Sequence, residues 1–369
     1  MLGRRDVGHR IVVRRIVGNQ SGRTLFTDAL GELVELTETH LTLATANGSL
    51  RVPLGEVHRA KRVPPARRPS AASVIELELA SDEAWPAPVR DRLGDWLLRT
   101  ADGWSGRANS ALPIGDPDRP LDDAIDAVER WYAERGQPAL INVPLPLAAP
   151  VGAALDERGW TTRTLVLVQT APLTTVLEAA AARSDLPAVE LAETPSAGWF
   201  GLAAHRKAKQ ARGYGAAPLP ATELPAAAQH VLTAVDQVRF AHVYAAPTGA
   251  ASGSTGSRSG GSRPAGDRST ASRSMQGPSI EGRELIAVAR CTVTGQGRWL
   301  GLSLVEVVSG ARRRGLAQHM VRAAAQWAAG LGATGAFLQV EERNEAAVSL
   351  YRRLGFTTHH TYQTRVAPH

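Results

Sequence analysis

Residues 311–320 read ARRRGLAQHM and place three arginines directly before a glycine. The preceding run, RWLGLSLVEVV over 298–308, is rich in β-branched residues and has the length of a strand. After the glycine, apolar residues recur at helical spacing, at Leu316, Met320, Ala324, Trp327 and Leu331. The segment therefore predicts a strand, a turn and a helix in succession.

Such a turn has the properties of an anion site. The first N–H groups of a helix lack internal partners and lie at the positive end of its dipole. Gly315 has no Cβ to keep a phosphate away, and Arg312, Arg313 and Arg314 would add positive charge. The alternative is that the arginines are only the solvated start of a surface helix.

The chain also contains an internal repeat. Trp131 corresponds to Trp327 and Gly159 to Gly355, with an offset of 196 residues in both cases. Each copy reads as helix, strand, helix, Gly-aromatic and strand. This alternation indicates a mixed sheet with helices packed on it, and hence a duplicated α+β fold.

The two copies differ where chemistry is expected. At the offset of 196, Gly315 corresponds to Arg119 and Arg314 to Asp118, while Asn344 corresponds to Ala148 and Tyr351 to Leu155. If one copy is active, it is the second.

Two motifs in the second copy resemble those of the GNAT superfamily of acetyl-CoA-dependent N-acetyltransferases. Arg312, Gly315 and Ala317 match the pyrophosphate motif Q/R-x-x-G-x-G/A, although Ser309 stands where the family usually has proline. NEAAVSLYRRLGF, at 344–356, is similar to N-x-x-A-x-x-x-Y-x-x-x-G-F. For the second motif the alternative is structural, with an asparagine that caps a helix and a tyrosine that fills the core.

The resemblance implies acetyl-CoA as cosubstrate and no metal. The strand that ends at Val307 would separate from its neighbour and pair with the peptide-like pantetheine arm. Tyr351 would be the general acid that protonates the departing thiolate. Contacts with acetyl-CoA are then expected at Val305, Val307, Arg312, Arg313, Arg314, Gly315, Leu316, Ala317, Asn344 and Tyr351.

A base for the incoming amine is harder to assign. Glu306 alternates with Val305 and Val307 and would face the opposite side of the strand, where it is either the catalytic base or an exposed or paired glutamate. His205 and His242 are remoter candidates that also fit surface or core positions. Cys291, the one cysteine of the chain, is expected to fill the core and excludes an intramolecular disulfide.

Composition predicts three parts. Short alternating runs over 9–63 predict a small β-barrel of about five strands over 1–64, and a proline-rich stretch at 64–71 predicts a linker. The resemblance implies that this barrel is SH3-like. A degenerate GNAT-like unit is expected over 72–172 and a catalytic GNAT domain over 186–369. Within the catalytic domain, 247–279 holds 16 Gly and Ser and predicts a disordered insert in a hairpin.

The net charge of +7 is concentrated outside the main body, because the first 70 residues carry +6 and the insert +3. The basic barrel leaves a second function class open, an acetyl-CoA-binding regulatory or interaction protein. It carries only Phe26 for base stacking, so we expect a structural or protein-contact role in place of nucleic-acid binding.

The whole layout resembles an actinobacterial acetyltransferase type that includes N-acetylglutamate synthases. That resemblance suggests a small amine acceptor such as glutamate, and it is compatible with a homodimer. No apolar run approaches the roughly 18 residues of a membrane span, so a cytoplasmic protein is expected.

Overall fold

The computed structural model describes residues 2–20, 23–45, 48–63, 69–212, 224–245, 279–280 and 283–368. The chain forms two compact units, Met1–Arg68 and Pro69–His369. The predicted insert at 247–279 lies outside the described residues, except for Ser279. Among the helices of the described ranges, none is both long and apolar enough to cross a membrane.

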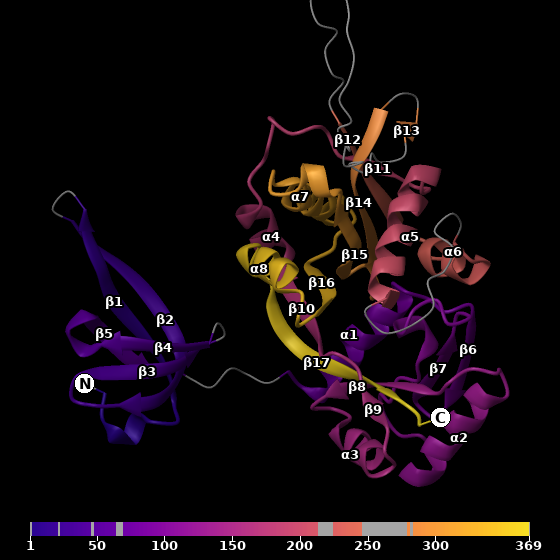
Figure 1. Cartoon of the computed structure of the whole chain (residues 1–369), viewed down its shortest axis with the longest axis horizontal. Helices are drawn as coiled ribbons and strands as arrows, with labels where there is room; N and C mark the ends of the chain where they lie inside the picture. The colour runs from indigo at the N-terminus through magenta and orange to yellow at the C-terminus, as the bar shows by residue number, and fades with distance from the viewer. Residues whose placement is uncertain are drawn as a thin grey trace, which may run out of the picture. The chain divides into compact units, whose positions relative to one another are not determined.

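The first unit is a five-stranded antiparallel sheet in the order β4-β3-β2-β1-β5 (Figure 1). The predicted alternation is confirmed, because one set of apolar side chains is fully buried, including Ile11, Leu33 and Leu43. Closure into an SH3-like barrel stays a prediction. The elements are η1 (Arg4–Asp6), β1 (Arg10–Gln20), β2 (Arg23–Leu36), β3 (His40–Thr45), β4 (Gly48–Pro53), η2 (Leu54–Glu56) and β5 (Val57–Arg62).

The second unit is built on one long mixed sheet in the order β11-β12-β14-β15-β16-β10-β17-β8. Two short strands, β9 and β13, pair with β17 and β14, and β6 and β7 form a separate hairpin. The strands are β6 (Val89–Leu93), β7 (Trp96–Thr100), β8 (Leu140–Leu145), β9 (Thr161–Thr162), β10 (Val166–Pro172), β11 (Glu190–Ala192), β12 (Val238–Tyr244), β13 (Ser279–Ile280), β14 (Arg283–Thr294), β15 (Trp299–Val307), β16 (Gly335–Glu341) and β17 (Thr357–Val366).

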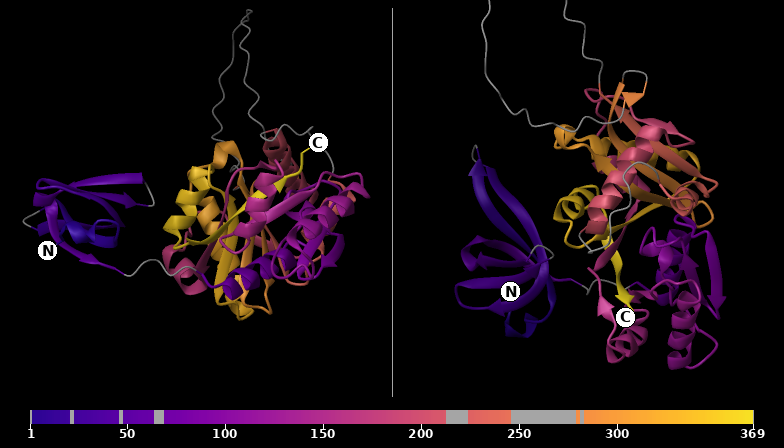
Figure 2. Two further views of the ribbon diagram at one scale, coloured as in Figure 1. Left: turned by 90° about the horizontal axis from the view of Figure 1, so that it is seen from below. Right: turned by 45° about the vertical axis from the view of Figure 1, so that its right-hand side comes forward.

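Helices cover both faces of this sheet, as Figures 1 and 2 show. Around β14 and β15, α7 packs on one face and α5 and α6 pack on the other. The predicted mixed α+β class is therefore confirmed. The helices are α1 (Ala71–Glu83), α2 (Leu121–Ala133), η3 (Arg107–Asn109), α3 (Ala149–Glu157), α4 (Leu173–Ala179), α5 (Ala197–Arg212), α6 (Ala226–Thr233), η4 (Ser309–Ala311), α7 (Leu316–Gly330) and α8 (Glu345–Arg353).

Two element boundaries differ from the sequence prediction. The helix α1 begins at Ala71, inside the predicted linker, because the Ser70 side chain accepts a hydrogen bond from the Ser73 N–H at 3.1 Å and caps the helix. Leu331 does not extend the apolar stripe of α7, since the helix ends at Gly330 and the leucine is exposed.

The internal repeat is present in the structure. The offset of 196 residues takes the bounds of α3 onto those of α8, and it takes α2 onto α7 to within one residue at each end. Gly159 and Gly355 both follow their helices with positive φ, at 74° and 87°, which is the conformation that favours glycine after a helix.

The two copies share the sheet by exchanging strands. The first copy's β10 lies between β16 and β17 of the second copy and is antiparallel to both. In return, β17 pairs with the first copy's β8. Each copy thus places its last strand beside strands of the other, so the sheet runs through both copies without a break. The limits of the two GNAT-like units, 72–172 and 186–369, stay predictions.

Candidate functional site

The strands β15 and β16 separate before they end. They pair in parallel from Trp299 and Gly335 as far as Leu302 and Leu338. Beyond these residues β15 continues to Val307 and β16 continues along β10, with no described pairing between the two. The separation expected of the strand that ends at Val307 is confirmed.

A bulge in β15 lies at the point of separation. Val288 pairs with Glu306 and Arg290 with Ser303, so β15 has one residue more than β14 over this interval. Leu304 has a φ of 51°, which is uncommon for a residue with a large side chain. Leu304 packs with the cluster under α5, whereas Val305 and Val307 pack with the cluster under α7. By alternation, Glu306 lies on the face opposite these two valines.

The turn after β15 leads directly into α7. Arg313 has a φ of 65°, and Gly315, which precedes the first residue of α7, has a φ of 91°. No side chain caps this helix and its first turn has no acidic residue. Leu316 is buried, so at this position only the main chain can face a ligand. The main-chain N–H groups at the start of α7 are therefore suited to an anion.

The three arginines do not act as a set. Arg312 bends back toward β15, where its Nε donates to the Val307 carbonyl at 3.0 Å and its Nη2 to Glu306 Oε1 at 3.0 Å. Arg313 and Arg314 are exposed beside the turn. Glu306 is thus a paired glutamate in this structure, which is one of the two roles that its sequence position allowed.

Arg183 is a cation at the turn that the sequence did not indicate. A Cβ placed on Gly315 would lie 2.8 Å from Arg183 Nη1. Arg183 also holds Asp185, with Nε to Oδ1 at 2.7 Å and Nη2 to Oδ2 at 2.6 Å, and this hydrogen bonding lowers the pKa of Asp185 to about 2. Arg183 lies far from Gly315 in the sequence, and no sequence motif includes both residues.

The connection that carries Arg183 is fixed to α7. Arg322 donates from Nη1 to the Leu177 carbonyl at 2.7 Å, and Gln318 donates from Nε2 to the Ala179 carbonyl at 3.4 Å. Leu186, which follows Arg183, packs against the cluster that contains Leu316. The connection between the two copies therefore holds a guanidinium at the start of the second copy's helix.

Asn344 and Tyr351 lie on α8, and both have structural roles. Asn344 caps the helix, with its Oδ1 accepting from the Ala347 N–H at 3.3 Å. Tyr351 is buried in the cluster that contains Leu302 and Leu338, the last paired residues of the separated strands. Its ring meets Phe356 edge-on at 5.7 Å. The structural alternatives are present, and roles toward a ligand stay predictions.

The remoter catalytic candidates are core residues or undescribed. His242 is buried, with Nδ1 2.9 Å from the Phe240 carbonyl and Nε2 3.0 Å from Ser196 Oγ, and burial lowers its pKa. Cys291 is fully buried, and burial raises the pKa of its thiol to about 12, so it is not a nucleophile. His205 lies in α5, but its side chain is outside the described residues.

The matching turn of the first copy is unsuited to phosphate. Asp122 and Asp123 lie in the first turn of α2, where α7 has no acidic residue. Arg158 pairs with Asp122 at 3.0 Å and with Asp126 at 2.5 Å, which holds these two carboxylates on α2. Carboxylates at this helix start repel an anion. Across the described residues, no group of three or more His, Cys, Asp and Glu side chains is arranged to hold a metal.

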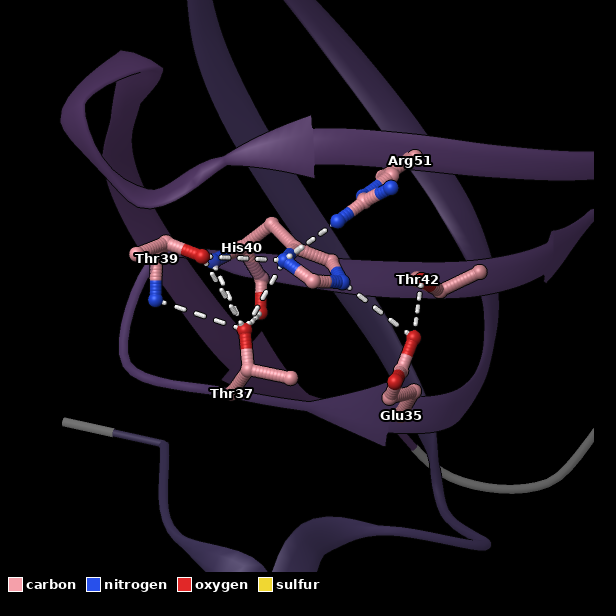
Figure 3. Close-up of polar contacts among 6 residues, drawn as sticks. All are labelled: Glu35, Thr37, Thr39, His40, Thr42 and Arg51. Carbon is pink, nitrogen blue, oxygen red and sulfur yellow. Dashed lines mark hydrogen bonds and ion pairs between the residues drawn. The ribbon is translucent and has the colours of Figure 1, made fainter.

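The first unit carries a polar network at a turn (Figure 3). His40 lies at its centre, with Nδ1 2.8 Å from Thr37 Oγ1 and Nε2 3.2 Å from Glu35 Oε2. Arg51 Nη2 approaches the same Nδ1 at 3.0 Å, and Thr42 donates to Glu35 at 3.0 Å. These hydrogen bonds connect β2, β3 and β4, so we assign the network to the stability of the sheet.

Comparisons with known proteins agree with this geometry. The chain is 31% identical over 159 residues to the "Probable histone acetyltransferase Rv0428c" of Mycobacterium tuberculosis, an alignment that spans 41% of this chain and 50% of that protein. A GCN5-related N-acetyltransferase from Kribbella flavida matches with a TM-score of 0.50 and 15% identity, over 82% of this chain and 97% of that one. This match shows the GNAT fold.

A tandem GNAT protein of the clavulanic acid biosynthesis pathway is also similar, with a TM-score of 0.43 and 12% identity, over 95% of this chain and 80% of that one. The family model described as "Probable histone acetyltransferase Rv0428c C-terminal" matches residues 71–263 and 271–365, which is most of the second unit. The chain therefore belongs to this family of GNAT-type acetyltransferases.

Proposed function

We propose that the second copy binds acetyl-CoA and transfers its acetyl group to a primary amine. The observation that carries the proposal is the separation of β15 and β16 after Leu302 and Leu338, directly before the turn at Gly315. Separated strands offer main-chain groups to a peptide-like arm, and the turn offers N–H groups to a pyrophosphate. Both features lie in the second copy.

The described residues fit acetyl-CoA. Val305 and Val307 lie on the part of β15 that has left β16, where main-chain groups would pair with the pantetheine arm. The N–H groups from Arg313 to Ala317 would hold the pyrophosphate, and Arg183 Nη1, the guanidinium nitrogen that does not bond Asp185, would donate to it beside Gly315. The Asn344 Nδ2 group has no acceptor among the described residues and would bond the arm.

In the reaction, the amine nitrogen forms a bond to the thioester carbonyl carbon, and the bond from that carbon to sulfur breaks. The chain has to orient the two reactants, accept a proton from the ammonium and return one to the thiolate. Tyr351 would be the donor, because a phenol with a pKa of about 10 suits a thiol with a pKa of about 8.5. Glu306 would accept the proton from the ammonium after its carboxylate has separated from Arg312.

The class of acceptor amine is the open part of the proposal. A small amino-acid-like amine, glutamate among the candidates, follows from the resemblance in the sequence. The Mycobacterium tuberculosis relative is described as a probable histone acetyltransferase, which favours a lysine of a protein as the second candidate.

A contact function for the first unit is compatible with either acceptor. Most of the exposed large apolar side chains of the described residues lie in this unit: Val7, Val17, Leu25, Phe26, Leu30, Val34 and Leu54. Scattered apolar residues are common on surfaces, but their concentration in one small unit favours a protein contact.

The test is turnover of acetyl-CoA with a panel of amino acids, polyamines and lysine peptides, followed by thiol release. Tyr351→Phe should lower kcat roughly 100-fold or more, the range of a lost general acid, with little change in acetyl-CoA affinity. Tyr132→Phe is the matched control, because this buried tyrosine packs in a cluster of the first copy that contains no residue of β15 or β16. Wild-type kcat in Tyr351→Phe would exclude that residue, and no turnover with any amine would contradict the proposed function.

A further inference from the structure

An aromatic and cationic cluster lies on the face of the sheet opposite α7. The ring of Trp85 has Arg107 Cζ 5.4 Å from its centroid and Arg290 Cζ at 5.3 Å. Trp104 stacks on Trp85 at 5.5 Å. Arg290 comes from the second copy, on β14, and the other three residues lie within 72–172, the predicted first copy. The first copy thus supplies most of this cluster.

The two arginines have different surroundings. Arg290 is fully buried, and it donates to three main-chain carbonyls, those of Leu232 and Ala84 at 2.8 Å and that of Val231 at 3.3 Å. Arg107 is half-buried, and its Nε is buried without a hydrogen-bond partner. Within the described ranges, neither arginine forms an ion pair with a carboxylate.

Arg107 is close to the separated strands. Its guanidinium hydrogen-bonds Tyr362; burial raises the pKa of Tyr362, and the contact with Arg107 offsets only part of that rise. The Tyr362 hydroxyl donates to Gln339 Oε1 at 3.1 Å. Gln339 is the first residue of β16 beyond its last pairing with β15. Trp85, whose ring Arg107 covers, packs in the same cluster as Leu304, the residue that follows Ser303 on β15. The guanidinium therefore lies near the point where the two strands separate.

Ser303 marks the same point on β15. It is the first residue beyond Leu302, it pairs across the sheet with Arg290, and its Oγ is buried with no hydrogen-bond partner. Cross-strand partners share a face, so Ser303 and Arg290 lie on the side of Trp85. Ser303 Oγ and Arg107 Nε, both without a hydrogen-bond partner, thus lie on one face of the sheet where the pairing of β15 with β16 ends.

Three acidic side chains on the elements of this face are already paired. Glu78 contacts His360 at 2.7 Å, Asp82 binds Arg99 at 2.9 Å and also Arg90, and Glu306 binds Arg312. A cation that is partly desolvated and lacks a counter-ion is unfavourable, and an incoming anion removes that cost. A guanidinium binds a carboxylate through two parallel hydrogen bonds.

We propose that Arg107 binds a carboxylate of the acceptor, so that the acceptor is an amino acid whose amine is directed to the separated strands. This inference rests on the proposed acetyl transfer and names its substrate class. Arg107 is then a specificity-determining residue that the degenerate copy contributes to the active copy. The aromatic rings of Trp85 and Trp104 would form the wall of the acceptor site.

The test measures binding directly, with N-acetyl amino acids as probes of the product class and their carboxamides as neutral counterparts. Calorimetric titration of the full chain should show carboxylates binding roughly 10- to 100-fold more tightly than carboxamides, the range of a charged hydrogen-bond pair. Arg107→Ala should remove this difference and Arg107→Lys should restore part of it. Arg92→Ala, an exposed arginine of the same copy, should leave it unchanged.

Equal binding of carboxylates and carboxamides, or discrimination that survives in Arg107→Ala, would overturn the proposal. Acetyl-CoA titration of Arg107→Ala verifies that the variant is folded and keeps the cosubstrate site. Turnover assays separate this inference from the proposed function: acetylation of lysine peptides at equal rates in wild type and Arg107→Ala would sustain acetyl transfer and exclude an amino-acid acceptor. Failure of turnover with every amine would instead count against acetyl transfer itself.

Discussion

At the scale of single residues, the candidate site depends more on main-chain geometry than on charge. Gly315 has a positive φ, and the space where its Cβ would lie is taken by Arg183. The three consecutive arginines that distinguish the sequence do not share one role, because Arg312 is used to hold Glu306. Motif letters indicated the turn correctly, whereas the cation beside Gly315 comes from a distant part of the chain.

Burial of neutral histidine predicts a pH dependence of stability. Burial lowers the pKa values of His242 and His359. In the unfolded chain the histidine pKa is about 6.5, so below this pH the unfolded chain binds more protons than the folded chain. The contribution of these histidines to stability is therefore full above about pH 6.5 and decreases as the pH falls. The melting temperature should therefore decrease between about pH 6.5 and pH 5.

The His242→Gln variant provides the comparison. Glutamine can still hydrogen-bond Ser196 but does not titrate, so the variant should melt with a shallower dependence on pH. Thermal unfolding monitored by circular dichroism at a series of pH values measures both slopes. An equal slope in the variant would show that His242 is not among the groups responsible.

At the scale of elements, local patterns predicted much of the fold. Periodicity predicted the strand, turn and helix around Gly315 and the strands that flank the insert. Comparison of the sequence with itself predicted the repeat with its offset of 196 residues. The exchange of β10 and β17 could not be predicted, because period-two alternation does not show which copy a strand will pair with. The cluster at Arg107 was hidden for the same reason, since it forms only when the copies share one sheet.

The shared sheet predicts that the second copy does not fold by itself. A fragment of residues 186–369 lacks β10, so β16 and β17 would each lose an antiparallel neighbour and expose a strand edge. We expect this fragment to aggregate or to lack cooperative unfolding, whereas the fragment 69–369 should unfold cooperatively. Size-exclusion chromatography and circular dichroism measure the outcome. A monomeric, cooperatively folded 186–369 would contradict the structural role of the exchanged strand.

At the scale of the whole molecule, the two copies contribute different features to the candidate site. The second copy keeps the separated strands and the uncapped helix start, while acidic residues occupy the matching helix start of the first copy. The first copy provides β10 and the segment around Arg107, and the connection between the copies carries Arg183. Under the proposed function and the proposed role of Arg107, the degenerate copy forms part of the active site.

The location of the acetyl-CoA site is tested most directly by calorimetric titration with acetyl-CoA. The titration compares three forms of the full chain: wild type, Gly315→Glu and Arg119→Glu. Position 119 matches position 315 in the other copy, so the same side chain is introduced at both turns. A carboxylate at the second turn would repel the pyrophosphate and strain a backbone with a φ of 91°.

We predict one acetyl-CoA per chain in wild type, binding weakened by at least about 100-fold in Gly315→Glu, and unchanged binding in Arg119→Glu. Circular dichroism of each variant verifies that the chain is folded. Wild-type affinity in folded Gly315→Glu, or loss of binding in folded Arg119→Glu, would contradict the assignment of the acetyl-CoA site to the second copy.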